Sequence, residues 1–418
     1  MHIWDDKAGY LTFNYKKYAY VKNRTGNYVS LYGDRLKRIN KWDKDQPELF
    51  ESDVSPEIRV LVDNYTDSDE LSVGHKIMIF DIEVEVTDGF PDPARAENTI
   101  TSIAFNDPLT DEYFCYVLDT KDKLNLGESR TKKDVDTILT GWNVEFFDVN
   151  YLYNRAVQVV GKDVANLLSP IGQVQWSEFS KRYKIAGVSV LDYLALYKTF
   201  TFGQRSSYRL DAIGEYEVGE KKVEYEGTLN DLYENDIDKF VQYNLQDVKL
   251  VKRIDEKLNF IEIGRGIAHL GHCPYEDVFM SSRYLEGAIL VYLKKKGIVA
   301  PNKPPRPKTF GNDKFAGAYV QDPIKGKHNW VYDLDITSMY PSCIMSLNIS
   351  PETKIGKIQG WNPEEFLKKN NKKTYSVTQN DKVIGRFTET ELKKFIDGKE
   401  IGIATNGVMY RTDKDGLL

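Results

Sequence analysis

The chain has 418 residues, enough for about two or three domains that each bury a core. Hydrophobic residues make up 41% and aromatic residues 12%, a composition that excludes an intrinsically disordered protein. The formal charge of -6 at pH 7 argues against a simple basic nucleic-acid binder, but not against an enzyme that meets phosphate through bound metal ions. No apolar run approaches the roughly 20 residues of a membrane span, and the amino terminus lacks a signal-peptide pattern. With three dispersed cysteines that do not suit a disulfide framework, the composition predicts a cytoplasmic protein in a reducing compartment and no membrane partner.

The first 75 residues alternate aromatic with charged side chains and carry turn signals at residues 25–27 and 32–34. This pattern predicts short antiparallel strands in a small amino-terminal module. Its aromatic and basic faces suit single-stranded nucleic acid, although a plain β module explains them better. The acidic residues 64–70 predict a linker that follows this module.

Residues 77–85 read Ile-Met-Ile-Phe-Asp-Ile-Glu-Val-Glu, an apolar run that changes into strict alternation. Such a pattern predicts a strand, and side chains two apart on a strand point the same way. Asp81 and Glu83 would therefore lie side by side, where two carboxylates repel each other unless a cation lies between them. Oxygen ligands of this kind suit Mg²⁺ or Mn²⁺. The alternative is an exposed edge strand with solvated acids.

The residues that follow predict an alternating α/β region. Strands are expected around residues 101–105, 112–118, 138–143 and 188–192, a hairpin at 174–185, and helices at 146–155, 193–199 and 235–261.

Three further polar residues of this region complete a candidate site. Tyr243 and Asp247 lie one turn apart on the same face of the long helix, and Asp148 lies near the start of an earlier helix. Alone, the first two form a weak signal, and Asp148 is equally explained as a partner of the helix dipole. Together with Asp81 and Glu83, however, they suit a site with two divalent cations for phosphodiester cleavage, in which the Tyr243 hydroxyl orients the attacking water.

The motifs that carry these residues resemble the three exonuclease motifs of family B DNA polymerases, the proofreading DEDDy group. They are Phe-Asp-Ile-Glu at 80–83, Thr-Gly-Trp-Asn to Phe-Asp at 140–148, and Tyr-Asn-Leu-Gln-Asp at 243–247. Residues 88–91, 189–198 and 350–353 are similar to segments of the T-even phage replicative enzymes.

The resemblance implies a ribonuclease H-like fold, a mixed sheet with flanking helices, and a role for each residue. Asp81, Glu83, Asp148 and Asp247 would bind two Mg²⁺ or Mn²⁺ ions, and Tyr243 would place the water. Phe90 would stack on the unpaired primer end, the hairpin at 174–185 would help to separate primer from template, and Asn143 and Lys222 would contact DNA or support the site.

A second part of the resemblance lies further along the chain. Residues 315–319 are similar to the family's loop at the crossing between the editing and synthesis sites, in which Gly317 would contact DNA, and residues 331–342 are similar to polymerase motif A. The latter pattern predicts a buried strand that ends in an acid. By the resemblance, Asp335 and the carbonyl of Ile336 would ligate metal, and Tyr340 would lie against the sugar of an incoming nucleotide.

The resemblance implies three regions: an amino-terminal domain at 1–75, completed by about 260–305, an exonuclease domain at 76–259, and a partial palm at 306–418. The fingers and the second acidic palm motif of the family do not occur in the sequence. We therefore expect a truncated or a split polymerase that makes DNA only when a second chain supplies the missing parts. The implied partners are a DNA primer–template, a single-stranded 3′ end, deoxynucleotides once the palm is complete, and a sliding clamp. Two alternatives remain open: a non-catalytic DNA-binding half, and an exonuclease of this ligand type that acts on RNA.

Overall fold

A computed structural model describes the chain except for residues 1, 6–8, 44–45, 47, 69, 72, 74, 88, 108–109, 121–137, 304–319, 369–372, 380–381 and 418. The chain divides into two compact units. The first comprises Met1–Tyr20, Arg38–Pro47 and Glu51–Ile298, and the second comprises Val21–Lys37, Glu48–Phe50 and Val299–Leu418. Within the described residues, every helix is too short or too polar to cross a membrane.

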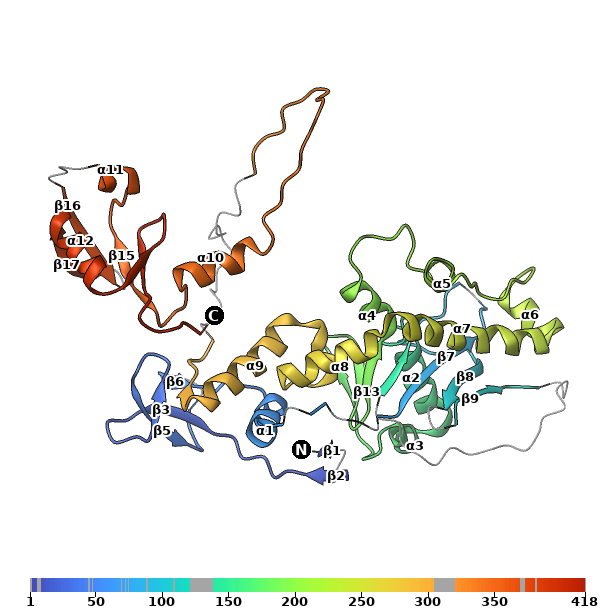
Figure 1. Cartoon of the computed structure of the whole chain (residues 1–418). Coiled ribbons are helices and arrows are strands. Elements are labelled where there is room, and N and C mark those ends of the chain that lie inside the picture. The colour runs from blue at the N-terminus through green and yellow to red at the C-terminus, as the bar shows by residue number, and fades with distance from the viewer. Residues whose placement is uncertain are drawn as a thin grey trace. The chain divides into compact units, whose positions relative to one another are not determined.

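A five-stranded mixed sheet forms the centre of the first unit, in the order β13-β10-β7-β8-β9 (Figure 1). Its strands are β7 (Ile77–Val84), β8 (Ile100–Asp107), β9 (Glu112–Val117), β10 (Ile138–Gly141) and β13 (Ser189–Asp192). Strand β7 is central, parallel to β10 and antiparallel to β8. The edge-strand alternative for Asp81 and Glu83 is therefore wrong.

The two faces of β7 have opposite characters, as its alternation predicts. Phe80, Ile82 and Val84 are buried in a hydrophobic cluster on one face. Burying each such side chain contributes about 1.5–3 kcal/mol. Because side chains alternate along a strand, Asp81 and Glu83 project from the other face. Burial of these apolar side chains thus fixes the face of β7 on which the acidic side chains lie.

Helix α7 (Ile237–Leu258) contacts β7, β8 and β9 and lies along the sheet (Figure 1). Its start is capped by Asp236, whose side chain accepts a hydrogen bond from the backbone N–H of Lys239. It ends at Asn259, whose left-handed φ of 56° stops the helix. The amphipathic pattern of the sequence therefore predicted this helix to within three residues at each end.

The remaining elements of the first unit surround this core. They are β1 (His2–Asp5), β2 (Gly9–Thr12), α1 (Pro56–Tyr65), α2 (Asp148–Val160), α3 (Lys162–Ala165), η1 (Asn166–Leu168), β11 (Val174–Ser177), β12 (Arg182–Ile185), α4 (Tyr193–Phe200), α5 (Leu210–Val218), α6 (Leu229–Asn235), α8 (Phe260–Gly271), η2 (Tyr275–Phe279) and α9 (Ser281–Lys295). Strands β11 and β12 pair as the expected hairpin. Helix α1 corrects the expectation of strands alone before residue 75, and its start has an evident cause. Ser55 accepts a hydrogen bond from the Ile58 N–H, and Pro56 occupies the first turn.

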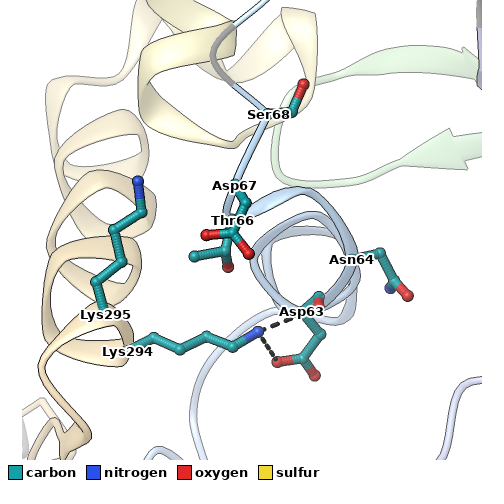
Figure 2. Close-up of a pocket in the computed structure, with 7 residues that line it drawn as sticks. All are labelled: Asp63, Asn64, Thr66, Asp67, Ser68, Lys294 and Lys295. Atoms are coloured by element: carbon teal, nitrogen blue, oxygen red, sulfur yellow. Dashed lines mark hydrogen bonds and ion pairs between the residues drawn. The ribbon is translucent and has the colours of Figure 1, made fainter.

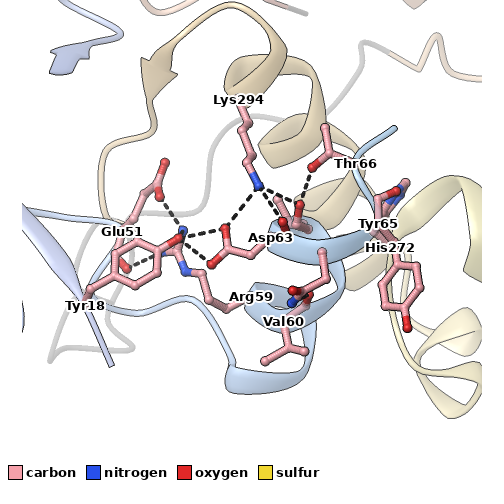
Figure 3. Close-up of polar contacts among 11 residues, drawn as sticks. Tyr18, Glu51, Arg59, Val60, Asp63, Tyr65, Thr66, His272 and Lys294 are labelled. Carbon is pink, nitrogen blue, oxygen red and sulfur yellow. Dashed lines mark hydrogen bonds and ion pairs between the residues drawn. The ribbon is translucent and has the colours of Figure 1, made fainter. Parts of the chain in front are cut away.

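A polar network ties α1 to its neighbours in the first unit (Figure 3). The Arg59 guanidinium donates to the Glu51 carboxylate at 2.6 Å and to the Tyr18 hydroxyl at 3.1 Å. Tyr18 in turn donates to Asp63 at 2.8 Å, and the Lys294 ammonium caps the α1 carbonyl of Val62 at 2.9 Å. Residues far apart in the sequence are thus held by one set of charge-assisted bonds.

The other strands and helices form two further sheets and their coverings. One sheet has the order β14-β4-β5-β3-β6, from β3 (Ala19–Lys22), β4 (Tyr28–Ser30), β5 (Arg35–Ile39), β6 (Leu49–Phe50) and β14 (Ile298–Val299). The other, in the second unit, has the order β17-β16-β15-β19-β18, from β15 (Lys354–Ile358), β16 (Thr374–Gln379), β17 (Lys382–Thr388), β18 (Ile401–Ile403) and β19 (Val408–Arg411). The second unit also holds α10 (Met339–Leu347), α11 (Pro363–Leu367) and α12 (Glu389–Gly398).

Candidate metal centre

Three acidic side chains from β7 and α7 meet at one point. A carboxylate oxygen from each of Asp81, Glu83 and Asp247 lies within 4.8 Å of the others. The two acids of β7 share a face because they are two residues apart, and α7 places Asp247 opposite them. The sequence spacing thus predicted the pair, and the packing of α7 supplies the third acid.

The electrostatics of this cluster favour a cation. Burial, together with the charges of Glu83, Asp148 and Asp247, raises the pKa of Asp81 well above its usual value. Burial and the Asp247 carboxylate raise the pKa of Glu83 to about 8. In addition, Oδ1 of Asp247 is buried without a hydrogen-bond partner in the described structure. Crowded carboxylates with a spare buried oxygen fit a divalent cation of the Mg²⁺ or Mn²⁺ type.

Lys222 lies in the same cluster. Its ammonium group contacts Oδ2 of Asp247 and lies 3.3 Å from the Tyr243 hydroxyl. Burial opposes the charge on Lys222, but Asp247, Tyr243 and Asp81 outweigh it and raise the lysine pKa. A tyrosine hydroxyl is protonated at neutral pH and able to donate a hydrogen bond, and burial raises the pKa of Tyr243 further above its usual value. The structure therefore brings both predicted residues beside the acids.

Asp148 borders this group without belonging to it. It is the first residue of α2, and its Oδ1 accepts a hydrogen bond from the Ile82 N–H at 3.1 Å. Burial raises its pKa to about 7, and its charge in turn contributes to the raised pKa values of Asp81 and Glu83. The structure thus brings the fourth predicted acid next to the cluster, with one oxygen committed to the backbone of β7.

The turn before Asp148 is shaped by Asp192, which the sequence did not single out. The Asp192 carboxylate accepts hydrogen bonds from the backbone N–H groups of Asn143 at 3.2 Å and Glu145 at 3.1 Å. Asn143 itself has a left-handed φ of 68°. A Cβ at Gly141 would collide with the Phe80 carbonyl, so only glycine permits this close approach. The predicted Asn143 therefore forms the turn that leads into α2.

Phe90 lies beside the same helix start. Its side chain is 80% exposed, and its ring centroid is 5.1 Å from that of Phe147, the residue before Asp148. The hairpin of β11 and β12 presents a second exposed ring at its turn, Phe179, which is 94% exposed. Both rings are free to contact a ligand.

Two residues outside the predicted site support the cluster: Asn244 contacts Asp81 directly, and Ser102 contacts Asn244. Asn244 donates from Nδ2 to Oδ2 of Asp81 at 2.7 Å, and Ser102 donates to the Asn244 Oδ1 at 2.9 Å. The signal for Asn244 was its place between Tyr243 and Asp247 on α7. Nothing in the local pattern of β8 distinguishes Ser102.

The motif A segment differs from its prediction. Residues 331–336 form no strand, and Leu334 and Ile336 are 92% and 68% exposed. A strand forms by pairing with a neighbour, and none of the described strands pairs with this segment. Asp335 is exposed, as is Tyr340 at 66%, while Gly317 lies outside the described residues.

A cavity elsewhere in the first unit does not share these residues (Figure 2). Its volume is about 630 Å³, and both acidic and basic side chains line it. Lys294 is already paired to Asp63 at 3.3 Å. Its lining residues are Asp63, Asn64, Thr66, Asp67, Ser68, Lys294 and Lys295. The cavity is therefore not the site formed by the predicted acids.

The mixed sheet and its acidic cluster define an α/β protein with a site suited to divalent cations. The sequence model described as "DNA polymerase family B, exonuclease domain" matches residues 131–213, and the one described as "DNA polymerase family B" matches residues 279–396. The chain belongs to the family B DNA polymerases, with the exonuclease domain and part of the palm. The expected fold class is confirmed.

Named relatives agree with this assignment. The chain is 28% identical over 390 residues to the DNA-directed DNA polymerase of Escherichia phage RB69, and this match covers 82% of the chain and 40% of the relative. The chain is 29% identical over 339 residues to the DNA-directed DNA polymerase of Enterobacteria phage T4, and this match covers 70% of the chain and 37% of the relative. The family B DNA polymerase of Pyrobaculum calidifontis shares the fold with a TM-score of 0.63 at 16% identity, covering 97% of this chain and 57% of that one. The chain thus spans about 40% of the length of its phage relatives.

Proposed function

We propose that this chain is the proofreading part of a family B replicative DNA polymerase and hydrolyses DNA from the 3′ end. The observation that carries the proposal is the meeting of Asp81, Glu83 and Asp247, whose oxygens lie within 4.8 Å of one another. Such a cluster, unstable by itself, is suited to binding two divalent cations, Mg²⁺ or Mn²⁺.

The residues of the site divide the chemistry among them. Asp81, Glu83 and Asp247, with Asp148 beside them, would hold the ions. Bound divalent cations supply Lewis-acid stabilisation of the leaving oxygen and lower the pKa of the attacking water. The protonated Tyr243 hydroxyl orients that water, and Lys222 balances the negative charge of Asp247. The products would be nucleoside 5′-monophosphates.

The substrate contacts belong to the same proposal. Phe90 is exposed next to the start of α2 and offers a face on which an unpaired base stacks. The hairpin of β11 and β12 would help to keep primer and template apart. Asn143 shapes the turn between these features and Asp148.

The test is the shortening of a single-stranded DNA oligonucleotide with a 5′ label in the presence of Mg²⁺. We expect a ladder that shortens from the 3′ end, and we expect the Asp81→Ala variant to lose this activity. Undiminished degradation by that variant would contradict the proposal. An RNA oligonucleotide of the same sequence separates the rival ribonuclease, which would cleave RNA in preference. A non-catalytic binding half would bind the DNA and leave it intact.

A partner that completes the palm is the second part of the proposal. Five neighbouring apolar side chains of the motif A region are between 68% and 92% exposed: Trp330, Val331, Tyr332, Leu334 and Ile336. Exposed apolar runs of this kind mark surfaces that another polypeptide covers. In the completed polymerase, Asp335 and Ile336 would bind metal, Tyr340 and Gly317 would contact nucleotide and DNA, and the partners would be primer–template, deoxynucleotides and a sliding clamp in the host cytoplasm.

Primer extension tests this second part. We expect no DNA synthesis by the chain alone, and synthesis after addition of a polypeptide that carries the fingers, the remaining palm and the thumb. The Asp335→Ala variant should lose synthesis but keep exonuclease activity. Synthesis by the unaccompanied chain would refute the need for a partner.

A further inference from the structure

Asn244 joins helix α7 to strand β7 by a side-chain hydrogen bond. It lies on α7 between Tyr243 and Asp247, and its side chain is fully buried. Its Nδ2 donates to Oδ2 of Asp81 at 2.7 Å. A hydrogen bond this short from a buried donor restricts the rotation of the Asp81 carboxylate.

The amide of Asn244 is itself held in a single orientation. Its Oδ1 accepts a hydrogen bond from the Ser102 hydroxyl at 2.9 Å and lies 3.8 Å from the Cys115 Sγ. Ser102 is buried on β8, directly opposite Glu83 in the strand register. Because both donors point at Oδ1, the N–H groups of the amide must face Asp81.

We propose that Asn244 is a positioning residue that holds the Asp81 carboxylate in its metal-binding orientation, and that Ser102 fixes Asn244 in turn. One Asp81 oxygen then accepts the hydrogen bond from Asn244, and the other remains for a cation. Partners behind metal ligands commonly account for about 10–100-fold in metal affinity. This inference rests on the proposed function only in taking Asp81 as a metal ligand.

The test is the binding of Mn²⁺ to the full chain without DNA, measured as free Mn²⁺ by electron paramagnetic resonance. We expect the Asn244→Ala variant to bind Mn²⁺ about 10-fold more weakly than the wild type. Ser102→Ala should give a smaller loss in the same direction. In the double variant, the loss should equal that of Asn244→Ala alone, because Ser102 acts through Asn244.

Asn106→Ala is the matched control. Asn106 is also a buried asparagine that supports β7, but it accepts a hydrogen bond from the Ile79 backbone N–H at 2.8 Å and forms no hydrogen bond with Asp81 in the described structure. This variant should lose stability and keep its affinity for Mn²⁺. Equal weakening by Asn106→Ala and Asn244→Ala, or unchanged binding in Asn244→Ala, would overturn the proposal.

Two readouts keep this inference separate from the nuclease assignment. If Asn244→Ala does not fold, as judged by circular dichroism, Ser102→Ala decides the matter, and unchanged Mn²⁺ binding in that variant overturns the proposal. If the wild-type chain binds Mn²⁺ but leaves DNA intact, the proposed function fails while the positioning role is still judged by the titration.

Discussion

The ammonium group of Lys222 lies against the carboxylate of Asp247 in the same cluster as Asp81 and Glu83. The lysine side chain is 30% exposed, whereas that of Asp247 is 2% exposed. Lys222 therefore supplies positive charge to a carboxylate that water scarcely reaches, where a divalent cation would do the same.

Replacing Lys222 by glutamine should destabilise the metal-free protein. Asp247 would lose its buried partner, a loss that costs about 3–5 kcal/mol for a fully buried pair and less here because the lysine is partly exposed. Added Mn²⁺ should raise the melting temperature of Lys222→Gln more than that of the wild type, since the cation replaces the missing charge. A thermal unfolding series with and without Mn²⁺ measures both effects. Equal metal-induced shifts in the two proteins would count against this role of Lys222.

The raised carboxyl pKa values predict how stability varies with pH in the absence of metal. Glu83 titrates near 8 in the folded protein, against 4.5 ordinarily, and Asp148 near 7 instead of 3.8. At a pH between the ordinary and the raised pKa of each group, the folded chain holds a proton that the unfolded chain has lost. The free energy of unfolding therefore falls as pH rises from about 4 to 8. Saturating Mg²⁺ should flatten this slope, because the cation replaces the protons. Melting temperatures in chelator and in Mg²⁺ check this, with Glu83→Gln as the control that reduces the metal-free slope.

Replacing Tyr243 by phenylalanine separates water placement from metal binding. The hydroxyl is the only group lost, and it lies beside Lys222 at 3.3 Å and not among the clustered carboxylates. We expect single-turnover hydrolysis of a DNA oligonucleotide to slow by about 10²-fold, the lower end of the range for such groups, with unchanged Mn²⁺ affinity. A Tyr243→Phe enzyme as fast as the wild type would remove this residue from the chemistry.

The exposed ring of Phe90 should contribute to the binding of single-stranded DNA. Stacking on one base is worth about 1–3 kcal/mol, so Phe90→Ala should weaken binding of a short oligonucleotide by about 5–150-fold. The matched control is Phe202→Ala, because that ring is fully exposed on a different loop. Fluorescence anisotropy in Ca²⁺, chosen to limit hydrolysis, measures both affinities. Similar losses in the two variants would show that any exposed ring has the same effect.

The buried pair of Arg59 and Glu51 should dominate the stability of the region around α1. Their side chains are 4% and 7% exposed, and they lie 2.6 Å apart. Arg59→Met leaves the Glu51 carboxylate buried without its partner, which costs about 3–5 kcal/mol. The double variant Arg59→Met, Glu51→Leu should recover much of this loss, because no charge remains buried. Urea unfolding of the three proteins gives the comparison, and a double variant no more stable than Arg59→Met would contradict it.

Local pattern predicted the secondary structure of the exonuclease region well. The alternation in β7 placed Asp81 and Glu83 on one face, and the three-and-four spacing of apolar residues located α7. The alternation of aromatic and charged residues before α1 favoured strands throughout the first 75 residues and concealed this helix. The sequence signal for its start is the Ser55 cap followed by Pro56. For motif A, the apolar run at 331–336 predicted a buried strand, but burial requires a partner that the sequence pattern does not supply.

The sequence by itself determined how the candidate acids are spaced and that Asp81 and Glu83 share one face of β7, because strand and helix periods are local properties of the chain. Only the tertiary structure decided that Asp247 reaches the pair on β7, that Asp148 has one oxygen bonded to the backbone of Ile82, and that Asn244 and Ser102 stand behind Asp81. Those contacts join residues far apart in the sequence. They arise from the packing of α2 and α7 on the sheet, which depends on the whole core and not on any single segment.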